Sequence, residues 1–215
     1  MTRFALALLA MLARFSGVAA AQSTTTSETW PEIDVFWRPA EHQRTFLELS
    51  GSAEQESSKR QATAGLYQDY LNLPFGYVRG GYRYTFSTRD ASYRESRLVA
   101  EGVASKSIMW RFRALNRARF EWRWVNGDPS YRVRERVQIQ VVSNAKRGPG
   151  WTPYGTLEAY YDSRYRTVAR VGGRVGTEAR LSGRMTTDVY LARQNNFRGA
   201  PDRLNALGLV LRITF

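Results

Sequence analysis

The chain has 215 residues, of which 43% are hydrophobic and 13% aromatic, and its formal net charge is +13. This length fits one domain, and the absence of cysteine excludes disulfides, thiol catalysis and cysteine-based metal sites. Abundant aromatic residues normally raise hydropathy, yet the mean hydropathy is −0.47. Apolar residues at every second position resolve this contrast, and that arrangement is typical of a transmembrane β-barrel.

Met1 to Ala21 has the features of a secretory signal peptide. Arg3 precedes the apolar run Phe4 to Ala13, and Ala19 to Ala21 forms an A-x-A type cleavage site. An amino-terminal membrane helix is disfavoured because the apolar run is shorter than the roughly 20 residues of a helical span, and Arg14 interrupts it. We therefore predict that the signal peptide is cleaved and that any membrane crossing is made by strands.

Residues 22–42 are predicted to form an amino-terminal tether or periplasmic segment. Gln22 to Glu28 is rich in Ser and Thr, which is typical of a linker. Trp30 to Arg38 shows some alternation, but Pro31 and Pro39 bracket it, and proline is unfavourable inside a sheet. This pattern leaves open whether the segment belongs to a barrel wall.

From residue 43 to residue 215 candidate strands follow one another with turn residues between them. The pattern predicts an all-β fold, an antiparallel transmembrane β-barrel of about ten strands. The predicted strands are 43–53, 61–71, 76–87, 93–104, 108–125, 131–142, 152–162, 166–176, 181–194 and 203–215. Because single-chain barrels of this kind have an even strand number, adding Trp30 to Arg38 points to twelve strands as the alternative.

Strand direction fixes the side on which each connection lies. Both ends of an even-stranded barrel lie in the periplasm, so the connections alternate in side when they are counted back from Phe215. The predicted outer loops are 54–60, 88–92, 126–130, 163–165 and 195–202. The predicted periplasmic connections are 72–75, 105–107, 143–151 and 177–180.

Within the predicted strands one parity is apolar and aromatic, and the other collects charge. A shift of one residue would turn every charge toward lipid, so the pattern fixes the register. The expected lumen network consists of Arg79, Arg97, Glu101, Arg113, Arg117, Arg119, Glu121, Arg132, Arg134, Glu158, Arg170 and Asp188. Asn116 and Glu135 fall on the lipid-facing parity, and a β-bulge is the expected remedy.

The closing segment, Arg203 to Phe215, has one apolar face and one mixed face. In an exported chain, a strand that ends on an aromatic residue resembles the terminal assembly signal of bacterial outer-membrane barrels. Leu211, Ile213 and Phe215 are therefore expected to engage the barrel assembly machinery as a partner. The outward faces of all strands are expected to contact outer-membrane lipid.

Short motifs recur in a fixed order at Glu95 to Leu98, Leu115 to Arg123, Tyr131 to Arg134 and Leu157 to Tyr161, followed by the closing strand. In their order and spacing these Arg-x-Arg and Glu-x-Arg motifs resemble an uncharacterised family of Gram-negative outer-membrane β-barrels, domain of unknown function 2490. The resemblance covers most of the mature chain. It implies an outer-membrane barrel and no established activity, so it leaves function open.

The chemistry-bearing residues favour a structural role over catalysis. Barrel enzymes need a nucleophile or a positioned water with a base, commonly a histidine. The only histidine, His42, lies in a turn beside Glu41. No catalytic, cofactor-binding or metal-ligating residue is assigned, and no cofactor is expected. The inward carboxylates have arginine neighbours and are expected to form ion pairs.

The expected location is the cell outer membrane of a Gram-negative bacterium, and three functions are considered. The favoured one is a structural or interaction role with a side-chain-filled lumen, since a barrel of about eight strands is just wide enough for side chains to fill. The alternatives are a narrow pore that prefers small anions and a lipid-modifying enzyme. Nucleic-acid binding is disfavoured because the chain carries an export signal and its arginines alternate inward.

Overall fold

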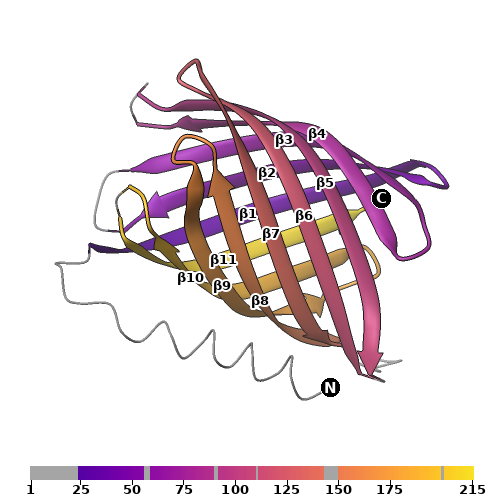
Figure 1. Ribbon diagram of the computed structural model, residues 1–215. Helices are drawn as coiled ribbons and strands as arrows, with labels where there is room; N and C mark the ends of the chain where they lie inside the picture. The colour runs from indigo at the N-terminus through magenta and orange to yellow at the C-terminus, as the bar shows by residue number, and fades with distance from the viewer. Residues whose placement is uncertain (1–23, 56–58, 90–91, 110, 143–149, 200) are drawn as a thin grey trace.

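The computed structural model describes residues 24–55, 59–89, 92–109, 111–142, 150–199 and 201–215, and within them all regular structure is β-strand (Figure 1). In chain order the strands are β1 (Thr25–Ala40), β2 (Gln43–Glu54), β3 (Arg60–Leu73), β4 (Gly76–Ser87), β5 (Arg94–Met109), β6 (Phe112–Val125), β7 (Asp128–Val141), β8 (Trp151–Asp162), β9 (Thr167–Arg180), β10 (Met185–Asn196) and β11 (Arg203–Thr214). No helix in the described part is long and apolar enough to cross a membrane. The predicted signal peptide, residues 1–21, lies outside the described residues.

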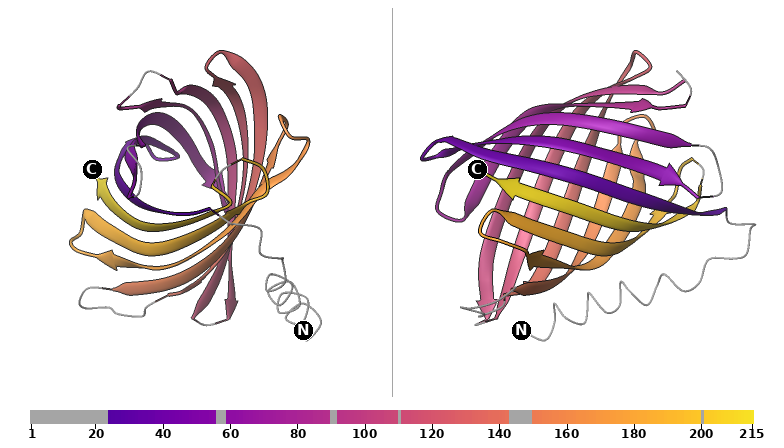
Figure 2. Two further views of the ribbon diagram at one scale, coloured as in Figure 1. Left: turned by 90° about the vertical axis from the view of Figure 1, so that its left-hand side faces the viewer. Right: turned by 180° about the vertical axis from the view of Figure 1, so that it is seen from behind.

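The strands close into a barrel in which neighbours in the chain are neighbours in the wall. Consecutive strands pair antiparallel. The wall is closed by β1 and β11, which run parallel from Thr25 opposite Arg203 to Phe36 opposite Thr214 and lie side by side in Figure 2. The all-β barrel is therefore confirmed, but the predicted ten or twelve antiparallel strands are wrong, because the described residues form eleven strands and one parallel pair.

The additional strand is β1, which occupies most of the segment that was predicted to be a tether. Its prolines lie where the ladder to β2 is interrupted. Pro31 has no N–H to donate, and the β1–β2 register omits it. Pro39 lies in a second irregularity of that register, between Trp37 and Ala40. Proline is tolerated in a strand at such positions, so neither residue excludes β1 from the wall.

The two faces of the wall have an inside-out distribution of side chains. Large apolar residues point outward and are exposed, for example Val175 at 63% and Leu191 at 61%. Charged residues of the opposite parity point inward, and Asp69 and Glu95 are 0% exposed. Strand β3 shows this alternation residue by residue over most of its length. The observed register thus places charge inside and apolar side chains outside, as the sequence predicts.

Two interior tyrosines lie against glycines of their own or neighbouring strands. A Cβ atom at Gly81 would stand 2.4 Å from Cδ1 of Tyr67, and one at Gly65 would stand 2.7 Å from Cε2 of the same ring. A Cβ atom at Gly208 would stand 2.0 Å from Cζ of Tyr190. The two rings therefore fill the space that these glycines leave on the inner face and pack directly against the backbone.

The turn between β6 and β7 is shorter than the predicted loop 126–130. It has only Asn126 and Gly127, whose φ values are 53° and 98°. Two residues in the left-handed backbone conformation form the type I′ turn, which matches the twist of paired strands. Asn-Gly is the preferred sequence of this turn. The connections predicted as outer loops all lie at the end of the barrel where β1 and β11 begin. Most of the predicted connection 143–151 lies outside the described residues.

Asn116 and Glu135 lie on the outward face, as the alternation predicts, but without a β-bulge. Strands β6 and β7 pair in one register from Phe112 opposite Val141 to the turn. Instead, Nδ2 of Asn116 donates a hydrogen bond to Oε1 of Glu135 at 2.5 Å. The predicted bulge is wrong because the two polar side chains satisfy each other on adjacent strands.

Candidate functional site

Arginines from neighbouring strands hold the buried carboxylates of the barrel interior. Asp69 on β3 lies between two of them. Nη2 of Arg44 on β2 is 2.5 Å from its Oδ2, and Nε of Arg79 on β4 is 2.6 Å from its Oδ1. A buried carboxylate is costly unless it is both paired and hydrogen-bonded, and Asp69 meets both conditions.

The contacts continue from β4 to β5 and β6. Nη1 of Arg79 lies 3.7 Å from Oε1 of Glu101. Nε of Arg119 donates to Oε2 of Glu101 at 2.6 Å, and Nε of Arg117 lies 3.6 Å from Oε1. Nη1 of Arg119 also lies 3.6 Å from Oε1 of Glu121. Glu101 is therefore shared by three guanidinium groups from both neighbouring strands.

Through Glu95 and Asp162 the contacts continue to β8. Nη1 of Arg97 lies 3.8 Å from Oε2 of Glu121, and Arg97 also pairs with Glu95. Arg123 pairs with Glu95, and its Nη1 lies 2.8 Å from Oδ2 of Asp162. Because Asp162 is on β8 and Arg123 is on β6, this ion pair passes over β7.

Asp162 ends β8 and also binds arginines of the adjacent strand β7 and of the turn after β8. Nη2 of Arg132 lies 3.3 Å from its Oδ2, and Nη2 of Arg164, in the turn after β8, lies 2.9 Å from the same atom. The backbone N–H of Arg164 donates to Oδ1 at 3.1 Å. The side-chain hydrogen bonds to Asp162 raise the pKa of Arg164 above its ordinary value, so this guanidinium stays charged.

These contacts form one continuous set, the main network, which runs from β2 to the turn after β8. Its members are Arg44, Asp69, Arg79, Glu95, Arg97, Glu101, Arg117, Arg119, Glu121, Arg123, Arg132, Asp162 and Arg164. Each of these ion pairs joins residues of one strand, of adjacent strands, of strands two apart, or of β8 and the turn after it. The main network therefore lines the wall and does not bridge opposite sides of the lumen.

A second group surrounds Glu158 on β8. Arg134 pairs with its Oε1, and Nε of Arg136 lies 2.8 Å from the same oxygen. Nη2 of Arg174 on β9 lies 4.0 Å from Oε2, which also accepts a hydrogen bond from the hydroxyl of Tyr160 at 2.5 Å. One carboxylate thus faces three guanidinium groups, so this side of the lumen has an excess of positive charge.

Arg170 on β9 adds to that excess. Its Nε donates to Oδ1 of Asn196 at 2.7 Å, and its guanidinium carbon lies 5.5 Å from the ring centroid of Tyr160. It forms no ion pair with any described residue. A neutral amide and an aromatic face stabilise the cation without cancelling its charge.

A third group lies at the seam where the barrel closes. The guanidinium of Arg212 on β11 lies 3.6 Å from Asp34 of β1, 2.9 Å from Glu178 of β9 and 3.1 Å from Asp188 of β10. The hydroxyl of Tyr154 donates to Oδ1 of Asp188 at 2.9 Å. One arginine therefore connects four strands, including both strands of the parallel pair.

The comparison with protein families gives one match. The family described as protein of unknown function (DUF2490) matches residues 41–205, most of the chain. The chain belongs to this family. The match includes β2 to β10 and the first residues of β11, and so the whole main network of this DUF2490 barrel. No curated protein matches the sequence.

The structure brings all but one of the residues predicted for the lumen network of the DUF2490 barrel to its interior. Arg113 is the exception, since it is exposed at the start of β6 and forms no ion pair with a described residue. Its place near the end of the wall, at the start of β6, explains its exposure. Leu211, Ile213 and Phe215 lie on the outward parity at the end of β11, and their engagement of the assembly machinery stays a prediction.

Five buried interior carboxylates were not among the predicted network residues: Asp34, Glu48, Asp69, Glu95 and Asp162. Glu48 on β2 accepts a hydrogen bond from the hydroxyl of Tyr67 at 3.0 Å and lies 3.1 Å from Nη2 of Arg83. Glu95 shares the parity of Arg97, which is the signal that could have identified it. Asp34 and Asp162 lie in a proline-flanked strand and beside a loop, where alternation is a weaker signal.

His42 lies exposed in the turn between β1 and β2, and its carbonyl accepts a hydrogen bond from the backbone N–H of Leu71 at 2.8 Å. Among the described residues no three or more His, Asp or Glu side chains are grouped to hold a metal ion. The chemically notable feature of the described barrel is therefore its arginine–carboxylate interior.

Proposed function

We propose that this protein is an integral β-barrel of the Gram-negative outer membrane, with a side-chain-filled lumen, a structural or interaction role and no catalytic activity. The inside-out wall is the observation that carries the membrane placement. Its buried face holds paired charges, while Val175, Leu191 and many other apolar side chains are more than half exposed on the outer face. Such a surface is stable in lipid and prone to association in water.

The burial of the network supports a filled lumen. A water-filled channel would leave the carboxylates that line it accessible to water. The side chains of Asp69, Glu95 and Glu101 are instead 0% exposed, and those of Glu121 and Asp162 are 2% exposed. Arginine side chains on β2, on β4 to β7 and in the turn after β8 therefore cover these carboxylates, which favours a rigid, ion-paired interior.

Fractionation tests the membrane placement. The mature chain should be extracted from the outer membrane by detergent, and the unboiled protein should migrate differently from boiled protein on a gel, because a closed barrel resists unfolding by detergent. Recovery of the protein from the periplasm in soluble form, without such a heat-dependent shift, would contradict the proposal.

A narrow path for anions is the second candidate, and the arginine excess around Glu158 favours it. One of these cations, Arg174, has a side chain that is 20% exposed to water, and that of Arg117 in the main network is 28% exposed. Arginine-lined pores concentrate anions in this way. The two candidates differ in one property, a steady ionic current through the refolded protein.

A further inference from the structure

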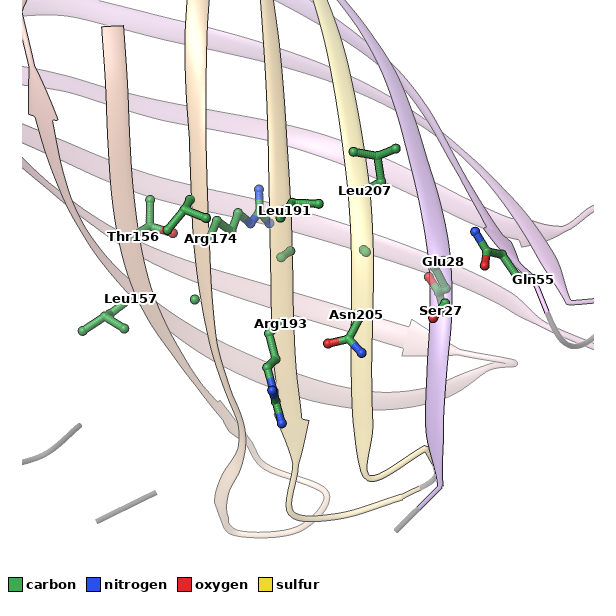
Figure 3. Close-up of a pocket in the computed structure, with 14 residues that line it drawn as sticks. Ser27, Glu28, Gln55, Thr156, Leu157, Arg174, Leu191, Arg193, Asn205 and Leu207 are labelled. Carbon is green, nitrogen blue, oxygen red and sulfur yellow. The ribbon is translucent and has the colours of Figure 1, made fainter. Parts of the chain in front are cut away.

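The outward face of the wall has a hollow of about 630 Å³ over β8 to β11 and the start of β1 (Figure 3). Exposed apolar side chains line it, namely Leu157, Val175, Leu191 and Leu207. Inward residues such as Arg174, Ala192 and Ala206 border the hollow directly beside outward lining residues, and Ser27, Glu28 and Gln55 border it on the β1 side. The hollow is therefore on the lipid-type face of the wall and not in the lumen.

Gly173 on β9 leaves this part of the outward face without a side chain. In the sheet it lies between Leu157 of β8 and Arg193 of β10. A Cβ atom there would stand 3.3 Å from the carbonyl oxygen of Thr156 and 3.7 Å from Cδ2 of Leu157. A side chain at this position would therefore point into the hollow, and glycine keeps it open for a slender apolar group.

The end of the hollow nearer the β10–β11 loop is polar and cationic. Arg193 on β10 pairs in register with Asn205 on β11, and both side chains point toward that loop (Figure 3). Arg203 precedes Asn205 by two residues and has the same outward parity, so it is a diagonal neighbour of Arg193, within reach of a long side chain. Neither arginine forms an ion pair with a described residue.

This lack of partners contrasts with the main network, in which every arginine contacts a carboxylate. No Asp or Glu has outward parity on β8 to β11 beside Arg193 and Arg203. Glu28 of β1 borders the hollow, but it has inward parity and accepts a hydrogen bond from Nε1 of Trp30, so none of these carboxylates pairs with the two arginines. The neighbouring outward positions farther from the loop, Leu191 and Leu207, are apolar. The surface thus changes from cationic to apolar along the strands, which is the polarity of a lipid with an anionic headgroup.

We propose that this surface binds a phosphate-bearing lipid of the surrounding membrane, with its phosphate between Arg193 and Arg203 and an acyl chain in the hollow over Gly173. The guanidinium fork suits phosphate because it donates paired, charge-assisted hydrogen bonds. The inference rests on the proposed membrane placement, which brings this face into contact with lipid. It gives the outward wall a specific lipid partner, in addition to general solvation by the bilayer.

Native mass spectrometry of the full-length protein in detergent tests the headgroup contact, with phosphatidylglycerol as the probe. The unmodified protein should retain one phosphatidylglycerol, and Arg193→Gln with Arg203→Gln should weaken its binding roughly tenfold. The matched control, Arg166→Gln with Arg198→Gln, changes two exposed arginines of the loops at the same end and should retain the lipid. Equal retention by both double variants, or equal loss, would overturn the proposal.

A second pair of variants tests the hollow. Gly173→Leu should fill it and reduce retention, whereas Gly80→Leu adds the same side chain to an outward position with open space around it and should not. Diacylglycerol with the same acyl chains should bind more weakly than phosphatidylglycerol, and inorganic phosphate should not displace the lipid. Retention of diacylglycerol as strongly as phosphatidylglycerol would contradict the phosphate contact. Fractionation of cells that produce the same variants tests the membrane placement separately.

Discussion

Arg212 on β11 and Asp34 on β1 form an ion pair across the parallel seam, with Nε and Oδ2 3.6 Å apart. The same guanidinium reaches Glu178 and Asp188, so it connects the seam to the two preceding strands. Parallel pairing is slightly less stable per residue than antiparallel pairing. A side chain that holds carboxylates from both sides of the seam therefore stabilises the closure of the barrel where its ladder is weakest.

Replacing Arg212 should destabilise the closed barrel. Arg212→Gln leaves Asp34 and Asp188 buried without their cation, and breaking a buried ion pair in this way costs about 3 kcal/mol. The midpoint of urea unfolding, followed by the heat-dependent gel shift, should fall. Arg113→Gln is the control because Arg113 is exposed and has no ion pair with a described residue. Equal midpoints for the two variants would show that the seam does not depend on Arg212.

The parallel seam predicts that the two ends of the barrel chain lie on opposite sides of the membrane. Strands β1 and β11 run in the same direction, so Thr25 and Phe215 lie at opposite ends of the barrel. With Phe215 in the periplasm, an epitope tag inserted before Thr24 should bind antibody on intact cells, and a tag after Phe215 should not. Both tags inaccessible until the outer membrane is permeabilised would indicate an even-stranded barrel.

Packing around Tyr67 predicts different effects at two consecutive glycines. Gly81 faces the ring, and a Cβ atom there would stand 2.4 Å from it, whereas Gly80 faces outward with nothing within 4 Å. Gly81→Val should lower the free energy of unfolding by about 3 kcal/mol through overpacking. Gly80→Val should change it little. Urea titrations of the two variants with matching midpoints would contradict the observed placement of the ring.

The outward pair Asn116 and Glu135 predicts a non-additive double substitution. Asn116→Leu alone removes the donor and leaves a carboxylate on the apolar face, which should lower the free energy of unfolding by about 1 kcal/mol. Adding Glu135→Leu should restore it, because neither polar group is then present. A double-mutant cycle from unfolding curves measures the coupling. Additive losses in that cycle would show that the two side chains do not depend on each other.

Phe215 is predicted to serve assembly through its ring. Its backbone N–H donates to the carbonyl of Phe36 at 2.9 Å, so deleting Phe215 removes a seam hydrogen bond as well as the aromatic side chain. Phe215→Ala keeps the backbone contact. Both changes should lower the yield of membrane-inserted protein, compared with deletion of residues 22–23 as control. Normal insertion of Phe215→Ala would assign the effect to the seam instead.

The alternation of the strands predicted the fold class and the register, because a one-residue slip would turn charges such as Arg119 and Glu121 toward lipid. It did not predict β1. Prolines at positions 31 and 39 weaken a strand signal, and the rule of even strand number counts against an eleventh strand. Only the register of β1 with β11 shows that a parallel pair closes a barrel with an odd number of strands.

The arginines of the interior were easier to predict than their partners. Runs such as Arg132, Arg134 and Arg136 repeat on one parity, whereas the carboxylates that neutralise them are single residues on different strands. Asp162, for example, pairs with Arg123 two strands away. Such contacts depend on the curvature of the wall, which the sequence pattern of one strand does not contain.

Single-channel recording in a planar bilayer most directly tests the ion-paired, filled interior. The refolded protein should show no steady current, and the Arg117→Gln and Arg134→Gln double variant should also be silent, with lower stability because Glu101 and Glu158 each lose a cation. Steady, anion-selective currents of the unmodified protein that this double replacement weakens would contradict a filled lumen and favour the anion path.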